Sequence, residues 1–115
     1  MDYKKFAIKL AKTVEGRYRV AAIILDKKDR IVSWGVNSYS QTHPIMAKYA
    51  KVCGNDLKVF IHAEVSALIK SKGKGYKIFV CRIDNSDRVC IAKPCPICEM
   101  AIKEHGGIKV IEYTI

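Results

Sequence analysis

The sequence predicts an α/β domain in which a mixed sheet is covered by helices. Segments with helical and with strand periodicity alternate along the 115 residues, and that alternation is typical of layered α/β domains. Residues 20–25 form a continuous apolar run, which at this length indicates a strand buried on both faces. The chain has the usual size of one domain, so residues 1–115 are expected to form a single unit.

The N-terminal half contains one clear helix and one clear hairpin. Residues 3–14 carry a single apolar stripe with helical spacing, and Gly16 is expected to end that helix. Residues 18–26 and 31–36 are the expected hairpin strands, joined by a polar turn at 27–30. Residues 37–59 have mixed polarity with a turn signal at 54–56, and the His43-Pro44 step disfavours helix before the proline. A long functional loop is therefore expected here.

The C-terminal half alternates helices and strands. Residues 62–71 are expected to form a helix, residues 76–83 a strand, and residues 88–93 a short extended return after a turn at 85–87. The last helix is expected over residues 94–105, because Pro94 suits a helix start and Gly106-Gly107 a stop. Residues 108–115 close the chain as a strand, which brings the expected sheet to about four to five strands.

Charge and cysteine content narrow the classes of protein. The net charge of +10 favours an anionic partner such as nucleotide phosphates, nucleic acid or an acidic protein, although scattered lysines also serve simply to solvate a surface. No apolar segment reaches the roughly 18 residues of a membrane span, and no secretory signal is recognisable. Five cysteines, an odd number, argue against a disulfide framework, so a cytoplasmic location without membrane contact is expected.

Two short motifs contain the residues expected to carry chemistry: His62-Ala63-Glu64 and Pro94-Cys95-Pro96-Ile97-Cys98. Each opens a predicted helix. One imidazole and two thiolates are donors that zinc prefers, and three protein ligands leave a fourth position open, as catalytic zinc sites do. A nearby carboxylate, Glu64, is suited to moving protons. Taken alone, the Cys-x-x-Cys pair also fits half of a structural zinc site or a redox pair.

The two motifs together resemble the signature of the zinc-dependent cytidine and deoxycytidylate deaminase superfamily. The resemblance is strongest from about residue 34 to residue 113 and is closest to small phage-type deoxycytidylate (dCMP) deaminases. It implies a three-layer α/β/α cytidine-deaminase-like fold. It also implies that His62, Cys95 and Cys98 bind Zn²⁺ and that Glu64 is the catalytic proton carrier.

The resemblance further implies substrate contacts. The backbone N–H of Ala63 would bind the base, the carbonyl of Pro94 would receive the leaving amino group, and Asn37 in Gly35-Val36-Asn37 would hold the base or sugar. Asn37 also fits an ordinary turn residue at a strand end. His43 is a candidate contact to a phosphate or flanking sugar, against the alternative of a surface histidine. With Cys53 it could form half of a second zinc site.

The resemblance implies hydrolytic deamination of a cytosine base, with dCMP to dUMP and ammonia the favoured reaction. The positive charge fits a phosphate-bearing substrate, and Lys48, Lys51 and Arg88 are candidate phosphate contacts. The alternatives are single-stranded DNA or RNA, free cytidine or deoxycytidine, and a non-catalytic zinc module that binds nucleic acid or protein. A small domain gains stability from association, and relatives assemble, so a homo-oligomer is expected.

Overall fold

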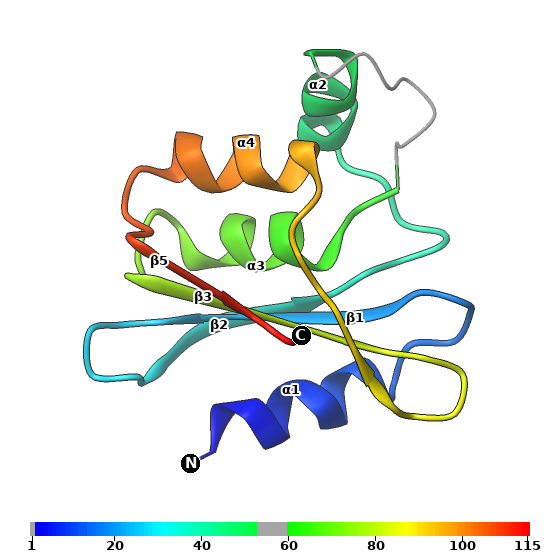
Figure 1. Cartoon of the computed structure of the whole chain (residues 1–115). Coiled ribbons are helices and arrows are strands. Elements are labelled where there is room, and N and C mark those ends of the chain that lie inside the picture. Colours follow the sequence, from blue (N-terminus) through cyan, green and yellow to red (C-terminus); the bar gives the residue numbers. More distant parts are fainter. Residues whose placement is uncertain (1, 53–59) are drawn as a thin grey trace.

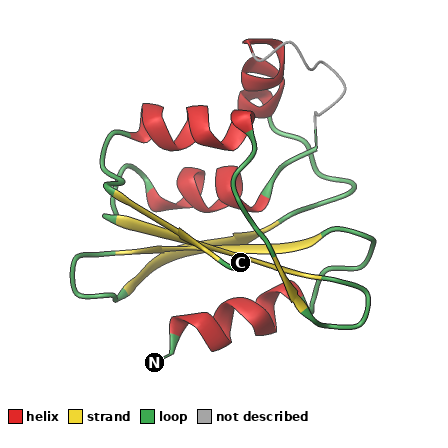
Figure 2. Ribbon diagram, in the orientation of Figure 1, coloured by secondary structure: helices red, strands yellow, loops and turns green. Residues whose placement is uncertain are grey.

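The computed structural model describes residues 2–52 and 60–115, which form three layers around one sheet (Figure 1). Helix α1 (Tyr3–Ala11) covers one face, and helices α3 (Ala63–Ser71) and α4 (Pro96–His105) lie side by side on the other. Figure 2 shows the same α/β/α layering by element type. Within the described parts of the chain, no helix is long and apolar enough to cross a bilayer. The fold class expected from the sequence is confirmed.

Five strands form the sheet: β1 (Arg19–Leu25), β2 (Ile31–Val36), β3 (Lys77–Ile83), β4 (Val89–Cys90) and β5 (Val110–Tyr113). The order is β2-β1-β3-β4, and β1 is antiparallel to both β2 and β3. Strand β5 runs parallel to β3 and pairs with its first four residues, whereas β4 pairs antiparallel with its last two. The sheet is therefore mixed, and β4 and β5 follow one another along the same edge of β3.

Alternation along β1 and β3 separates two hydrophobic cores. Ala22 and Ile24 of β1 and Val80 of β3 pack towards α3 and α4, while Ile23 and Phe79 pack towards α1. All five side chains are buried, which explains why residues 20–25 read as an unbroken apolar run. The predicted burial of this strand on both faces is confirmed.

The prediction of a long loop over residues 37–59 was partly wrong, because residues 44–52 form helix α2 (Pro44–Val52). Pro44 disfavours helix before itself, but its fixed φ and missing N–H suit the first position of a helix that follows it. The ring nitrogen Nδ1 of His43 accepts a hydrogen bond from the Ile45 N–H at 3.1 Å, and Met46 is fully buried. The helix packs against α4. The turn expected at 54–56 lies outside the described residues.

The two hairpin turns are built in the same way. In the first, one carboxylate oxygen of Asp26 accepts the N–H groups of Lys28 and Arg30, and the other accepts the Arg30 Nε–H. In the second, Asp84 makes the same three bonds, to the N–H groups of Ser86 and Arg88 and to the Arg88 Nε–H. These contacts lower the pKa of each aspartate, with the backbone N–H of the arginine as the largest cause.

Candidate active site

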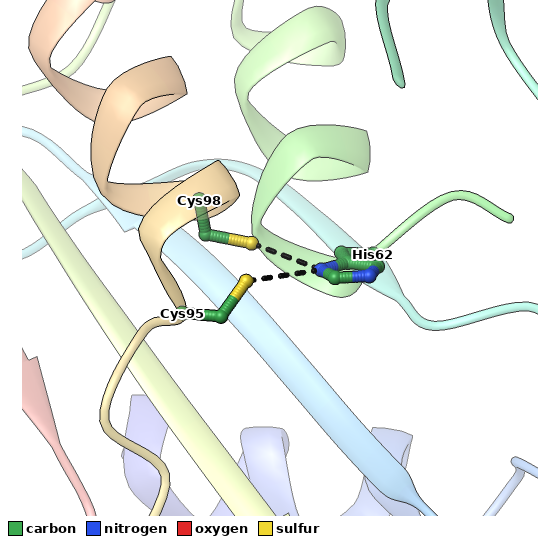
Figure 3. Close-up of side chains that lie close together, drawn as sticks. All are labelled: His62, Cys95 and Cys98. Atoms are coloured by element: carbon green, nitrogen blue, oxygen red, sulfur yellow. Dashed lines mark hydrogen bonds between the residues drawn. The ribbon is translucent and has the colours of Figure 1, made fainter. Parts of the chain in front are cut away.

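The side chains of His62, Cys95 and Cys98 meet where α3 and α4 begin (Figure 3). The Nδ1 atom of His62 lies 3.2 Å from the Sγ of Cys98 and 3.5 Å from the Sγ of Cys95. All three candidate ligand atoms lie within 4.8 Å of one another. The structure thus brings together the three residues that the sequence singled out as metal ligands.

The spacing of these donor atoms fits zinc. A tetrahedral zinc ion with a nitrogen at about 2.0 Å and a sulfur at about 2.3 Å holds those donors about 3.5 Å apart. The observed nitrogen-to-sulfur distances of 3.2 and 3.5 Å are close to that separation. One imidazole and two sulfurs are also the soft and borderline donors that zinc selects over magnesium or calcium.

The helix starts explain how these side chains come to face one another. His62 is the N-cap residue of α3 and Cys95 is the N-cap residue of α4, both with extended backbone. An N-cap side chain usually bonds to an N–H of the first turn, but neither of these does. The two side chains instead point towards one another between the starts of α3 and α4 (Figure 3). Pro96 fixes the first turn of α4, and Cys98 follows on the same side.

Close packing of α3 on β2 fixes the position of the first ligand. A Cβ atom built on Gly35 would lie 2.8 Å from the carbonyl oxygen of Ala63 and 2.8 Å from the backbone N of Ala67. Such distances are shorter than any ordinary contact, so only glycine permits this approach of strand and helix. The hydroxyl of Ser33, also on β2, donates to the carbonyl oxygen of Ala67 at 2.8 Å.

Glu64 is buried beside the three candidate ligands. Its side chain is 7% exposed, and the carboxylate accepts a hydrogen bond from the Cys98 thiol. Burial raises the pKa of Glu64, since removal from water disfavours the charged form. A carboxyl group beside candidate metal ligands is suited to taking up and releasing a proton.

The two thiols differ in their affinity for a proton. The pKa of Cys95 is lowered to about 3, chiefly because the single S–H of Cys98 is shared between the Cys95 sulfur and the Glu64 carboxylate, with a further contribution from His62. The pKa of Cys98 is raised, because it keeps the shared proton and is buried. The helix N-terminus also favours a thiolate at Cys95.

A cavity of about 490 Å³ opens beside the cluster. Its lining includes His62, Glu64 and Cys95, together with apolar side chains such as Ile61 and Ile91. The volume is in the range of small-molecule binding sites. The cluster is therefore accessible to a ligand rather than closed within the core.

Two of the predicted substrate contacts line this cavity. Ala63 is the first residue of α3, where a backbone N–H has no partner within the helix. Asn37 also lines the cavity, and its side chain bonds to the start of β1. Its Oδ1 accepts from the Val20 N–H and its Nδ2 donates to the Tyr18 carbonyl oxygen, both at 2.8 Å. The Asn37 amide thus has one free lone pair and one free N–H to offer a ligand.

The other two predicted substrate contacts are not among the lining residues. His43 is exposed and caps α2, and Pro94 is buried directly before Cys95. The candidate phosphate contacts Lys48 and Arg88 form ion pairs with Glu104 and Asp84, outside the cavity lining. Lys51 does not line the cavity either, and Cys53, considered for a second zinc site, lies outside the described residues.

Among the lining residues that sequence reasoning missed are Tyr18, Arg82 and Lys93. Arg82 is one residue from the end of β3, on the same face as Ile78 and Val80, which pack towards α3 and α4. A signal was available, because strand alternation places this charged residue on the face of the sheet that carries the two metal-site helices.

Comparison with known proteins gives a consistent result. The family model described as "Cytidine and deoxycytidylate deaminase zinc-binding region" matches residues 1–114. The structure is similar to the crystal structure of cytidine deaminase from Mycobacterium tuberculosis, with a TM-score of 0.52 and 23% sequence identity. The match covers 96% of this chain and 84% of that one. A single-site variant of the same enzyme matches with a TM-score of 0.51, again at 23% identity and with the same coverage of both chains. No match to the sequence was found among curated proteins.

The structural likeness confirms the fold, and the family model identifies the family. Its match extends over nearly the whole chain, and a histidine-cysteine-cysteine cluster of the kind that binds zinc is present in the described residues. The chain therefore belongs to the cytidine and deoxycytidylate deaminase family, the zinc-dependent hydrolytic deaminases, and its cofactor is Zn²⁺.

Proposed function

We propose that this protein catalyses the hydrolytic deamination of the cytosine base of dCMP, giving dUMP and ammonia. The observation that carries the proposal is the cluster of His62, Cys95 and Cys98 at the side of an open cavity, with Glu64 buried against it. We assign the first three as zinc ligands and Glu64 as the catalytic acid and base.

Zinc, when bound, supplies a Lewis acid that lowers the pKa of water to about 7. Glu64 accepts the proton that the attacking water loses and delivers a proton to the ring nitrogen N3 of the base. Glu64 then takes the second proton from the oxygen added at C4 and delivers it to the exocyclic amino group, so that the C4–N bond breaks and ammonia leaves. Water adds one oxygen at C4, and its two hydrogens account for the third hydrogen of ammonia and the hydrogen left on N3.

Residues around Glu64 orient the base. The backbone N–H of Ala63, which has no partner within helix α3, donates to the base carbonyl oxygen. The Asn37 side chain contacts the base or sugar through the Oδ1 lone pair and the Nδ2 hydrogen that its bonds to Val20 and Tyr18 do not use. The Pro94 carbonyl accepts the leaving amino group beside Cys95. We retain His43 only as a distant contact to a phosphate or flanking sugar, because its ring nitrogen already caps α2.

A second candidate substrate is the free nucleoside. The similar Mycobacterium tuberculosis structure is that of a cytidine deaminase, which favours this alternative. The net charge of +10 favours the phosphorylated substrate instead. Single-stranded DNA or RNA is the third candidate substrate.

The test is ammonia release by the zinc-loaded protein from dCMP, deoxycytidine, cytidine and a cytosine-containing oligonucleotide at matched concentration. We expect turnover of dCMP with the highest kcat/KM. Zinc content of one ion per chain without turnover of any of these substrates would instead indicate a zinc-containing binding module.

We further propose that residues 1–115 act as one catalytic domain in a cytoplasmic homo-oligomer. Among the described cysteines, Cys81, Cys90, Cys95 and Cys98, none forms a disulfide, as is usual in a reducing compartment. Phe60 and Ile91 are 44% and 56% exposed at the cavity, and apolar side chains at this exposure suit contact with a second copy. Sedimentation at several concentrations tests the association.

A further inference from the structure

Arg82 lines the cavity and forms no ion pair with a carboxylate of the residues that the structure describes. It lies near the end of β3, paired in the sheet with Val20 and Cys90, and it is one of the residues that line the cavity. Its side chain is partly buried, and its Nε atom is enclosed without any hydrogen-bond partner. Buried guanidinium groups in folded proteins are normally hydrogen-bonded or paired, so this one requires an explanation.

Two other arginines in the described part of the chain form ion pairs with carboxylates. Arg19 contacts Asp87 at 2.7 Å, and Arg88 contacts Asp84 at 3.2 Å. Arg82 has no such carboxylate among the described ion pairs. Its guanidinium lies over the ring of Tyr18, whose centroid is 4.7 Å from the guanidinium carbon. A guanidinium stacked on an aromatic ring keeps a fixed plane, and its N–H groups remain available at the edges of that plane.

The charges that line the cavity point to the missing partner. Glu64 is buried against the metal ligands, while Arg82 and the exposed Lys93 supply two positive charges elsewhere in the lining. Among the described residues of the lining, Arg82 and Lys93 are the lysine and arginine side chains, and the acidic groups, Glu64 and Cys95, both belong to the cluster at the starts of α3 and α4. An anionic group on a ligand would pair with the two cations, since the planar fork of arginine matches a phosphate with two parallel hydrogen bonds.

We propose that Arg82, held in plane by Tyr18 and assisted by Lys93, binds the 5′-phosphate of a nucleoside monophosphate in the catalytic cavity. The inference rests on the proposed deaminase function of the same site and names the residue that selects the nucleotide over the nucleoside. The phosphate supplies the anion that Arg82 lacks, and the cytosine base lies at the zinc site beside Glu64.

The first experiment measures binding without turnover. The products dUMP and deoxyuridine are titrated calorimetrically into the zinc-loaded wild-type protein, Arg82→Met and Arg88→Met. Methionine keeps a long apolar stem over Tyr18 and removes the charge, and Arg88 is a matched arginine outside the cavity. We expect wild type and Arg88→Met to prefer dUMP. Arg82→Met should lose about 10- to 100-fold in dUMP affinity, because a hydrogen-bonded charge pair of this kind is lost. Its deoxyuridine affinity should stay within about twofold of wild type.

The second experiment measures turnover of dCMP, deoxycytidine and a cytosine-containing oligonucleotide. Arg82→Met should raise KM for dCMP and leave kcat/KM for deoxycytidine unchanged. Arg82→Lys, which keeps the charge but not the fork, should fall between wild type and Arg82→Met, and it replaces the methionine variant if that one does not fold. Free inorganic phosphate should compete with dUMP in the wild type and not in Arg82→Met.

The two proposals fail in different ways. If wild type binds dUMP and deoxyuridine equally, or if Arg82→Met and Arg88→Met behave alike, the phosphate assignment is overturned while deamination stands. If the oligonucleotide is the best substrate and Arg82→Met weakens it, the phosphate belongs to a nucleic-acid backbone, and the monophosphate assignment is overturned. If no substrate is deaminated but Arg82-dependent dUMP binding persists, the deaminase function fails and the phosphate site stands.

Discussion

A Cβ atom on Gly35 would lie 2.7 Å from the Cβ of Ser66, so strand β2 and helix α3 meet at a contact that only glycine permits. Helix α3 begins directly after His62 and carries Glu64 in its first turn. The distance between β2 and α3 therefore determines where His62, the first proposed metal ligand, and Glu64, the proposed proton carrier, lie. Substitution of Gly35 can test this contact.

Gly35→Ala should both destabilise the protein and reduce activity. The added methyl group must push α3 away from the sheet, and overpacking of this kind costs about 1–3 kcal/mol. Thermal unfolding and dCMP turnover check the two effects. Adding Ser66→Gly should restore only part of the loss, because the other close neighbours, the Ala63 carbonyl oxygen and the Ala67 N, are backbone atoms. Full restoration by Ser66→Gly would show that α3 shifts freely.

Glu64→Gln should retain zinc and lose turnover. The amide keeps the size of the buried side chain but cannot carry a proton, and general acid–base catalysis of this kind contributes about 10²–10⁴-fold to the rate. Metal analysis and ammonia release on the same sample check both statements. Glu99→Gln, which alters an exposed glutamate in the first turn of α4, is the matched control and should behave as wild type. Activity of Glu64→Gln near the wild-type level would rule out the proposed proton carrier.

Removal of zinc should lower the stability of the whole domain. The proposed ligands lie on two separate helices, so the ion joins α3 to α4 and binds only the folded chain. At free zinc about 100-fold above its Kd, the expected stabilisation is about 2.7 kcal/mol. Thermal unfolding with and without a chelator measures it. Cys98→Ser should abolish the difference and Cys90→Ser should preserve it, since Cys90 lies on β4 away from the cluster. An unchanged midpoint after chelation would contradict the ligand assignment.

Acid should destabilise the protein partly through its two hairpin turns. The pKa values of Asp26 and Asp84 are lowered below their ordinary value of 3.8 in the folded state, chiefly by the backbone N–H groups of Arg30 and Arg88. The folded state therefore binds protons less readily than the unfolded chain. The resulting stability is complete above the unfolded pKa and is lost as the pH falls through the folded pKa.

Denaturant unfolding between about pH 6 and pH 3 checks this expectation. The double variant Asp26→Asn and Asp84→Asn should be less stable at pH 6 and should show a shallower loss of stability on acidification. Parallel curves for the variant and the wild type would mean that the turn carboxylates do not contribute to acid sensitivity.

The elements that local chemistry determines could be read from the sequence. The apolar run of β1 follows from neighbouring residues and was predicted correctly, whereas α4 was predicted to start at Pro94 but begins at Pro96, with Cys95 as its N-cap residue. The motifs at residues 62–64 and 94–98 were expected to meet in space because their histidine and cysteines together fit one zinc site. The roles of Asn37, Ala63, Pro94 and His43 stay predictions.

Other features depend on long-range contacts. Helix α2 was missed because the proline was taken as a stop rather than as a first residue. The parallel pairing of β5 with β3 joins residues more than 30 positions apart, and nothing local encodes it. Strand alternation could have placed Arg82 on the side of α3 and α4, but only the folded chain shows that it lines the cavity and that its Nε atom has no hydrogen-bond partner.

The three-layer arrangement has a practical consequence for handling the molecule. Helix α1 lies on one face of the sheet, whereas α3, whose first residues line the cavity, lies on the other (Figure 1). An affinity tag or fluorescent partner joined ahead of Tyr3 would thus be attached to the layer opposite the one that carries the metal-site helices. Immobilisation on a sensor surface through helix α1 would keep the sheet between the surface and α3.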